Sequence, residues 1–190
     1  MEHQILEDKS ISLDDKSDSM VVENFENIVE VFIEISKGSN IKYEFDKEKK
    51  YLVCDRILYT PFRYIFNYGF IPNTLSLDSD PIDAVVLVDE SLVPGCYIKC
   101  KIIGCLETSD AEGIDPKLIL CPIDKIDPKS KNINQITDLP TMLLEQIKYF
   151  FSHYKDLENK QVQIGNFVSR EQSIQIYLDS VENYKTQHTK

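Results

Sequence analysis

The order of the hydrophobic segments most constrains how this chain can fold. Short β-rich runs come first, at 29–35, 42–45, 84–88, 97–106 and 118–123, and another candidate strand lies at 162–167. Gly, Pro or Asp bounds most of them, as is typical of strands joined by tight turns. The run at 84–88 is continuously aliphatic, which indicates a strand buried on both faces. This pattern predicts an α+β protein that is rich in β-structure and built on a small closed barrel.

Two later segments carry apolar residues at helical spacing. The first stripe comprises Met142, Leu143, Ile147, Phe150, Phe151 and Tyr154. Asp138 is a candidate cap for this helix, and Pro140 suits its first turn. The second stripe comprises Ile174, Tyr177, Leu178 and Val181, and Ser169 and Gln172 precede it at capping-box spacing. We interpret both stripes as core packing.

The 190 residues suffice for about one domain, and the net charge is −11. Residues 1–28 hold eight acids and two lysines, so we expect a flexible acidic leader there and a single domain over 29–190. We expect no secretory signal, and the run at 84–88 is too short to cross a membrane. The negative charge argues against nucleic-acid binding, which needs an excess of Lys and Arg.

The cysteines indicate a reducing compartment. Their number is five, and an odd count without a secretory signal favours free thiols and a cytoplasmic location. Cys96, Cys100 and Cys105 lack the Cys-x-x-Cys spacing of a zinc site, and no histidine lies near them. We interpret them as small buried hydrophobic residues.

The densest polar cluster is the segment DSDPID at 78–83, directly before the buried run. Carboxylates this close repel one another, and divalent cations such as Mg²⁺ would remove the repulsion. An acidic turn that faces solvent is the alternative. An EF-hand calcium loop is excluded, because with Asp78 at its first position Ile82 would replace an oxygen ligand and Asp83 the required Gly.

A second acidic segment, TSDAEGIDPKL at 108–118, lies between two predicted strands. As a turn that faces the first cluster, it would bring Asp110 and Asp115 to the same ions. Cations and phenols recur along the chain as well: Lys42 with Glu44 on one strand face, Arg56, Tyr64, Tyr68, Tyr154 and Lys155. Carboxylates for metals, together with donors for phosphate oxygens, indicate phosphoryl transfer. The sequence has no P-loop motif.

Several blocks, in order, resemble those of the soluble inorganic pyrophosphatases of family I, of the bacterial type. DSDPID (78–83) is similar to the family signature, and IKYEFD (41–46), CDR (54–56), NYGFIPNTLSL (67–77), the 110–117 turn and FFSHYKDLE (150–158) also match. The resemblance runs from about residue 30 to about residue 185. It implies a five-stranded, OB-like closed β-barrel with flanking α-helices. It also implies a homohexamer, with residues 149–153 at a subunit contact.

The resemblance implies hydrolysis of pyrophosphate, bound as a magnesium complex, by direct attack of a metal-activated water. Asp78, Asp83 and Asp115 would hold two ions, Asp110 and Asp115 a further Mg²⁺, and Glu34 would act on another through water. Asp80 would be the general base, with Tyr68 close to it. Phosphate would be bound by Lys42, Arg56, Lys117, Tyr154 and Lys155, with Glu44 and Tyr64 in support. Mn²⁺ or other divalent ions are alternatives to Mg²⁺.

Two positions depart from the family pattern. Ala111 replaces a Glu found in many relatives, and Ser79 replaces a common Gly. The first change would tune metal affinity, and the pattern tolerates the second. Three alternatives remain: an OB-like binding module, a related phosphohydrolase acting on organic phosphates, and an inactive homologue. Every matched catalytic position carries the expected residue type, which argues against the last.

Overall fold

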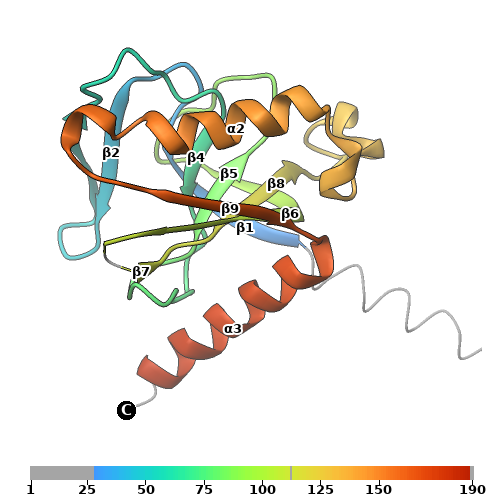
Figure 1. Ribbon diagram of the computed structural model, residues 1–190. Coiled ribbons are helices and arrows are strands. Elements are labelled where there is room, and N and C mark those ends of the chain that lie inside the picture. Colours follow the sequence, from blue (N-terminus) through green and yellow to red (C-terminus); the bar gives the residue numbers. More distant parts are fainter. Residues whose placement is uncertain (1–27, 112, 189–190) are drawn as a thin grey trace, which may run out of the picture.

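The computed structural model describes residues 28–111 and 113–188 (Figure 1). The predicted acidic leader therefore lies outside the described residues, except for Ile28. The strands are β1 (Ile28–Ile35), β2 (Ile41–Asp46), β3 (Tyr51–Ile57), β4 (Asn67–Phe70), β5 (Asp83–Val86), β6 (Tyr97–Asp110), β7 (Gly113–Ile114), β8 (Lys117–Pro122) and β9 (Gln163–Val168). The α-helices are α2 (Thr141–His153) and α3 (Arg170–His188), and η1 (Pro128–Asn132), η2 (Ile136–Asp138) and η3 (Asp156–Glu158) are 3₁₀ turns.

Five strands close into a ring in the order β1, β4, β5, β8 and β6, because β6 pairs with β1 as well as with β8. β5 and β8 run parallel, and the other pairs in the ring are antiparallel. β7 and β9 pair with β6, whereas β2 and β3 form a separate two-stranded sheet. The predicted five-stranded, OB-like closed barrel in an α+β fold is confirmed.

The barrel wall is buried on both faces. Val85 and Ile119 belong to a cluster that includes the buried residues of α2, whereas Ala84 and Leu118 belong to a second cluster against which α3 packs. Figure 1 shows α2 above the strands and α3 below them. Residues 84–86 of the aliphatic run therefore contact buried residues on both faces of the sheet, as predicted. β5 ends at Val86, and Leu87 and Val88 are half-buried.

The two predicted stripes differ in burial. In the first, Ile147, Phe150, Phe151 and Tyr154 are buried, Leu143 is half-buried and Met142 is 68% exposed. In the second, Ile174, Tyr177 and Val181 are only half-buried and Leu178 is 37% exposed, so this stripe packs less deeply than expected. Cys100 and Cys105 are buried and Cys96 is half-buried, in agreement with their interpretation as core residues. Burial raises the pKa of the Cys105 thiol to about 12, so this thiol is un-ionised at neutral pH.

The two predicted caps differ in outcome. Ser169 and Gln172 form the expected capping box, with N–H to side-chain oxygen distances of 3.3 and 3.2 Å. Asp138 does not cap α2. Its carboxylate accepts hydrogen bonds from the N–H groups of Asn134 and Gln135, because the short turn η2 intervenes, and Pro140 occupies the cap position of α2.

Strands β4, β6 and β7 differ from the sequence prediction. β6 continues to Asp110, so the acidic segment after it is a hairpin with β7 rather than a simple turn. β4 was not predicted, because Gly69 and the proline that follows favour a turn. Gly69 is required there, since a Cβ at this position would lie 1.8 Å from the carbonyl oxygen of Phe32 on β1. Within the described chain, no helix combines the length and apolarity that a membrane span requires.

Candidate active site

One polar cavity of about 240 Å³ gathers nearly all the predicted site residues. Its lining includes Glu34, Lys42, Glu44, Tyr64, Tyr68, Asp78, Asp80, Asp83, Asp110, Asp115, Lys117, Tyr154 and Lys155. These side chains come from five ring strands, the β2–β3 hairpin, the residues after α2, and the segments that precede β4, β5 and β8. Arg56 is the one predicted site residue outside the lining. It lies on β3, opposite Lys42 in the register.

Local hydrogen bonds shape the loop that carries Asp78 and Asp80. The buried Thr74 hydroxyl donates to the carbonyl of Ile71 at 2.5 Å and accepts from the N–H of Ile82 at 3.0 Å. The N–H of Asp80 donates to the Asp78 carboxylate at 3.0 Å. Ser79 between them has φ 72°, the left-handed conformation that favours glycine.

A buried lysine joins two of the predicted metal ligands. The Lys117 ammonium, with a side chain only 5% exposed, contacts the carboxylates of both Asp83 and Asp115. The parallel register places Lys117 directly beside Asp83. Burial opposes the lysine's charge, but the two carboxylates outweigh it and raise the pKa of Lys117. This cation is therefore charged at neutral pH.

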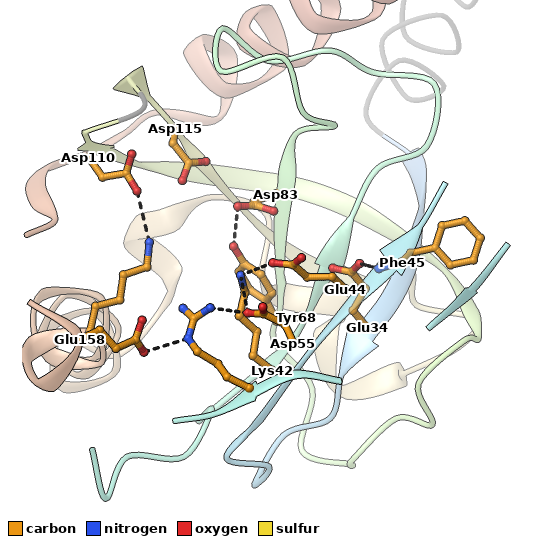
Figure 2. A network of polar contacts seen from close by, with 12 residues as sticks. Glu34, Lys42, Glu44, Phe45, Asp55, Tyr68, Asp83, Asp110, Asp115 and Glu158 are labelled. Carbon is orange, nitrogen blue, oxygen red and sulfur yellow. Dashed lines mark hydrogen bonds and ion pairs between the residues drawn. The ribbon is translucent and has the colours of Figure 1, made fainter. Parts of the chain in front are cut away.

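The resemblance placed Tyr68 close to Asp80, and both residues line the cavity. The Tyr68 hydroxyl donates to the Asp83 carboxylate at 2.5 Å (Figure 2). The reason is the pairing of β4 with β5, in which Tyr68 lies opposite Val85, two residues from Asp83. Asp80 instead accepts a hydrogen bond from Lys47 at 2.8 Å.

The carboxylates of the cavity are crowded and incompletely compensated. Burial, with the nearby charges of Asp83 and Glu44, raises the pKa of Glu34 to about 8, although the N–H of Phe45 donates to it at 2.7 Å. Burial, followed by the charge of Asp83, raises the pKa of Asp115 to about 6. Burial also raises the pKa of Asp78. Each ionised form would be stabilised by added positive charge.

The donor set fits divalent metal ions. Carboxylate oxygens are the ligands that hard cations prefer, and the cavity holds seven carboxylate side chains. Within residues 28–111 and 113–188, no three acidic, His or Cys side chains are already grouped around one point as metal ligands. Mg²⁺ does not need such a group, because it usually takes one or two carboxylates and completes its shell with water and phosphate.

The cations around the cavity are held by acidic partners. Lys155 donates to Asp110 at 3.2 Å, and Lys42 donates to Glu44 at 2.5 Å (Figure 2). Arg56 donates from Nε to Glu158 at 2.9 Å and contacts Asp55 through Nη1. These contacts place the phosphate-binding candidates at the site, each already paired with a carboxylate.

Sequence reasoning missed three of these polar residues: Lys47, Asp55 and Glu158. Lys47 follows a strand in a lysine-rich turn, where a charged residue is usually only solvated. Asp55 and Glu158 lie within the CDR and FFSHYKDLE blocks, which were the one signal that could have identified them. Arg56 and Glu158 are 102 residues apart in the sequence. No local sequence pattern predicts that they form an ion pair.

Comparisons with known proteins agree with this geometry. The family model described as inorganic pyrophosphatase matches residues 31–185. The inorganic pyrophosphatase of Helicobacter pylori is 47% identical over 156 residues, which cover 82% of this chain and 90% of that protein. The inorganic pyrophosphatase of Nanoarchaeum equitans is 47% identical over 160 residues, which cover 84% of this chain and 99% of that protein.

Solved structures give the same result. The chain superposes on a Helicobacter pylori inorganic pyrophosphatase with a TM-score of 0.82 at 46% identity, covering 84% of this chain and 95% of that one. It matches the Thermus thermophilus inorganic pyrophosphatase with a TM-score of 0.81 at 31% identity, covering 93% of this chain and 98% of that one. From the matched family model, the identity to relatives across most of its length and the shared fold, this chain belongs to the inorganic pyrophosphatase family.

Proposed function

We propose that this chain hydrolyses inorganic pyrophosphate to two phosphates, with divalent metal ions as cofactors. The observation that carries the proposal is the cavity itself, where seven carboxylate side chains and four lysines line one polar space. Pyrophosphate is a polyanion, so it needs both the lysines and the metal ions that the carboxylates would hold. Membership in the family supports the same reaction.

The carboxylates divide into metal ligands and a proton acceptor. Asp78, Asp83 and Asp115 are proposed to hold two ions, Asp110 with Asp115 to hold another, and Glu34 to act through water. Mg²⁺, with Mn²⁺ as an alternative, would cancel negative charge and lower the pKa of water towards neutrality when bound. The contact of Lys117 with Asp83 and Asp115 keeps these carboxylates together before any ion binds.

Asp80 is the proposed general base. Its side chain is 71% exposed and only its Oδ1 is paired with Lys47, so the carboxylate can accept a proton from the attacking water. The water oxygen bonds to one phosphorus, the bond from that phosphorus to the bridging oxygen breaks, and the second phosphate leaves. In this proposal water attacks directly and no covalent intermediate forms, because the carboxylates of the cavity serve as metal ligands and as the proton acceptor.

The cations and phenols would bind the phosphate groups. Lys42, Lys117, Lys155 and Tyr154 line the cavity, and Arg56 stands beside Lys42 on the hairpin. Positive charge at the leaving phosphate stabilises the negative charge that develops as the bridging bond breaks. Arg56 suits this task because its guanidinium is always charged and its N–H donors form strong hydrogen bonds to phosphate oxygens.

The decisive experiment measures phosphate release from pyrophosphate, with and without Mg²⁺, for the wild type and Asp80→Asn. We expect release that requires Mg²⁺ and falls on the order of 100-fold or more in the variant. Asp89→Asn, at an exposed ion pair with Lys129, is the control and should match the wild type. Absence of release from folded wild type would refute the proposal and favour an OB-like binding module. Faster release from a nucleoside triphosphate would favour a phosphohydrolase for organic phosphates.

We also propose that residues 29–190 form one domain and assemble as a homohexamer through α2. An apolar cavity of about 410 Å³ lies at this helix, lined by Phe62, Ile65, Met142, Tyr149 and Phe150 among others. Met142 and Tyr149 are 68% and 60% exposed, which is costly unless another subunit covers them. A monomeric mass by light scattering would refute the assembly.

A cytoplasmic location is proposed as well, because the five cysteines are free thiols, which indicates a reducing compartment.

A further inference from the structure

Arg56 is held by two carboxylates from distant parts of the chain. Its Nε donates to Glu158 Oε1 at 2.9 Å, and its Nη1 contacts Asp55. Among the described residues, no acceptor contacts Nη2. The two contacts therefore fix the guanidinium plane and leave a donor group for a ligand. An arginine bound in this way loses little further freedom when it meets a phosphate.

The strand register explains the contact with Asp55. Lys42 lies opposite Arg56 and Tyr43 opposite Cys54, so Asp55 is the extra residue of a β-bulge. The bulge places the Asp55 carboxylate beside both cations, since Lys42 also lies 3.6 Å from it. Asp55 thus holds Arg56 within the hairpin, but it does not tie the hairpin to the rest of the site.

Glu158 supplies that tie. It ends η3, the turn that follows α2, and its N–H donates to the carbonyl of Lys155 at 2.9 Å. Tyr154 and Lys155, the phosphate-binding candidates from this region, come immediately before η3. The side chain of Glu158 is only 6% exposed and that of Arg56 is 17% exposed, so this ion pair is shielded from solvent. It joins the β2–β3 hairpin to the end of α2.

We infer that Glu158 is a positioning residue, which orients Arg56 towards the leaving phosphate and sets its place relative to Tyr154 and Lys155. This inference rests on the proposed function. Glu158 does not line the cavity, so it acts through Arg56 and not on the substrate. Arg56 acts electrostatically on a residue that lines the cavity. Burial raises the pKa of Tyr154, and the positive charge of Arg56 partly opposes this rise.

Steady-state kinetics of Glu158→Ala, Glu158→Gln and the matched variants in an Arg56→Met background test the inference. Glu158→Ala should lower kcat/KM about 10-fold to 100-fold, the size expected when a catalytic group is misplaced by about 1 Å. Glu158→Gln keeps an acceptor oxygen at the same place and should stay within about 3-fold of the wild type. In the Arg56→Met background, Glu158→Ala should change kcat/KM by less than about 3-fold. Glu182→Ala, on the exposed surface of α3, is the control.

A spectroscopic readout separates positioning from a structural role. The chain has three arginines, Arg56, Arg63 and Arg170, so labelling arginine with ¹⁵N gives three Nε–H signals. Substitution of Arg56 identifies its signal. We expect this signal to be protected from solvent exchange in the wild type and Glu158→Gln, and to lose that protection in Glu158→Ala while the circular dichroism spectrum is unchanged.

Three results would overturn the inference. They are an equal loss of kcat/KM on Glu158→Ala with and without Arg56, full activity of the Glu158→Ala enzyme, and an Arg56 signal that is unchanged in Glu158→Ala. Failure of the proposed function is distinguishable, because the wild type itself would then release no phosphate. The Arg56 signal, followed as pyrophosphate and Mg²⁺ are added, still decides in that case whether Glu158 orients Arg56 for the ligand.

Discussion

Substitution of Glu34 by Gln should remove a large pH dependence from the stability of the metal-free protein. Glu34 lies on β1, and its pKa is raised from 4.5 to about 8, chiefly by burial. The folded-state pKa is higher than the unfolded one, so the fold favours the protonated form. Its stabilising effect is complete below pH 4.5 and is lost as the pH rises towards 8.

The size of the effect follows from the pKa values. Between pH 5 and pH 8 the unfolded chain keeps this carboxylate ionised, whereas the folded chain holds most of its proton. At 1.36 kcal/mol per pKa unit, the free energy of unfolding should fall by about 3 kcal/mol over this interval because of Glu34 alone. Gln has nearly the same shape, keeps an acceptor for the N–H of Phe45 and cannot ionise. In Glu34→Gln, the free energy of unfolding should therefore fall between pH 5 and pH 8 only by the amount that other groups contribute.

The measurement is urea unfolding in EDTA at pH 5, 6, 7 and 8, at one protein concentration. Glu30→Gln is the matched control, since Glu30 lies on the same strand with its side chain 60% exposed. The difference between wild type and Glu34→Gln should grow in favour of the variant as the pH rises, while the control should follow the wild type. A difference that changes by less than about 1 kcal/mol across this range would refute the reasoning.

Two further substitutions test the acidic loop and the lysine beneath it. Lys117→Met leaves the carboxylates of Asp83 and Asp115 without their shared buried cation and should cost about 3 kcal/mol at pH 8. The cost should be smaller at pH 5, because the pKa of Asp115 is raised to about 6 and its protonation relieves the repulsion. Equal losses in urea unfolding at both pH values would contradict this. Ser79→Gly relieves the backbone strain at φ 72° and should raise the free energy of unfolding by about 0.5 kcal/mol. If loss of the side chain instead only made the loop more flexible, the urea midpoint would fall, and that result would contradict the prediction.

The barrel could be predicted from the sequence because its strands carry local signals. Residues 84–86 of the predicted run at 84–88 are buried as expected, whereas Leu87 and Val88 are half-buried. The capping box at Ser169 and Gln172 forms as expected. β4 could not be found in this way. Gly69 disfavours a strand by local propensity, and its reason for being there is the close approach of the β1 backbone, a tertiary contact.

In the site, too, local signals were predictable and tertiary contacts were not. The carboxylates of 78–83 and 110–115 were identified because clustered charge beside a buried strand needs a partner. The residues that form hydrogen bonds with these carboxylates were not identified. Tyr68 donates a hydrogen bond to Asp83, and Lys47 reaches Asp80 from a turn 33 residues away. Such choices depend on strand register and on side-chain reach, which only the assembled structure provides. The roles assigned to these residues stay predictions.

The separate β2–β3 sheet has a consequence for how the molecule moves. Each ring strand has neighbours on both sides, whereas β2 and β3 pair only with each other within the described chain. Local opening of the hairpin therefore breaks fewer backbone hydrogen bonds than opening of the ring, and its amides should exchange with deuterium sooner. Because the hairpin carries Lys42 and Arg56 and the ring carries Glu34 and Asp83, the two walls of the cavity should differ in how readily they open, although side-chain contacts such as the Arg56–Glu158 ion pair hold the hairpin in place. The exit of products would then be governed by the least stable part of the fold.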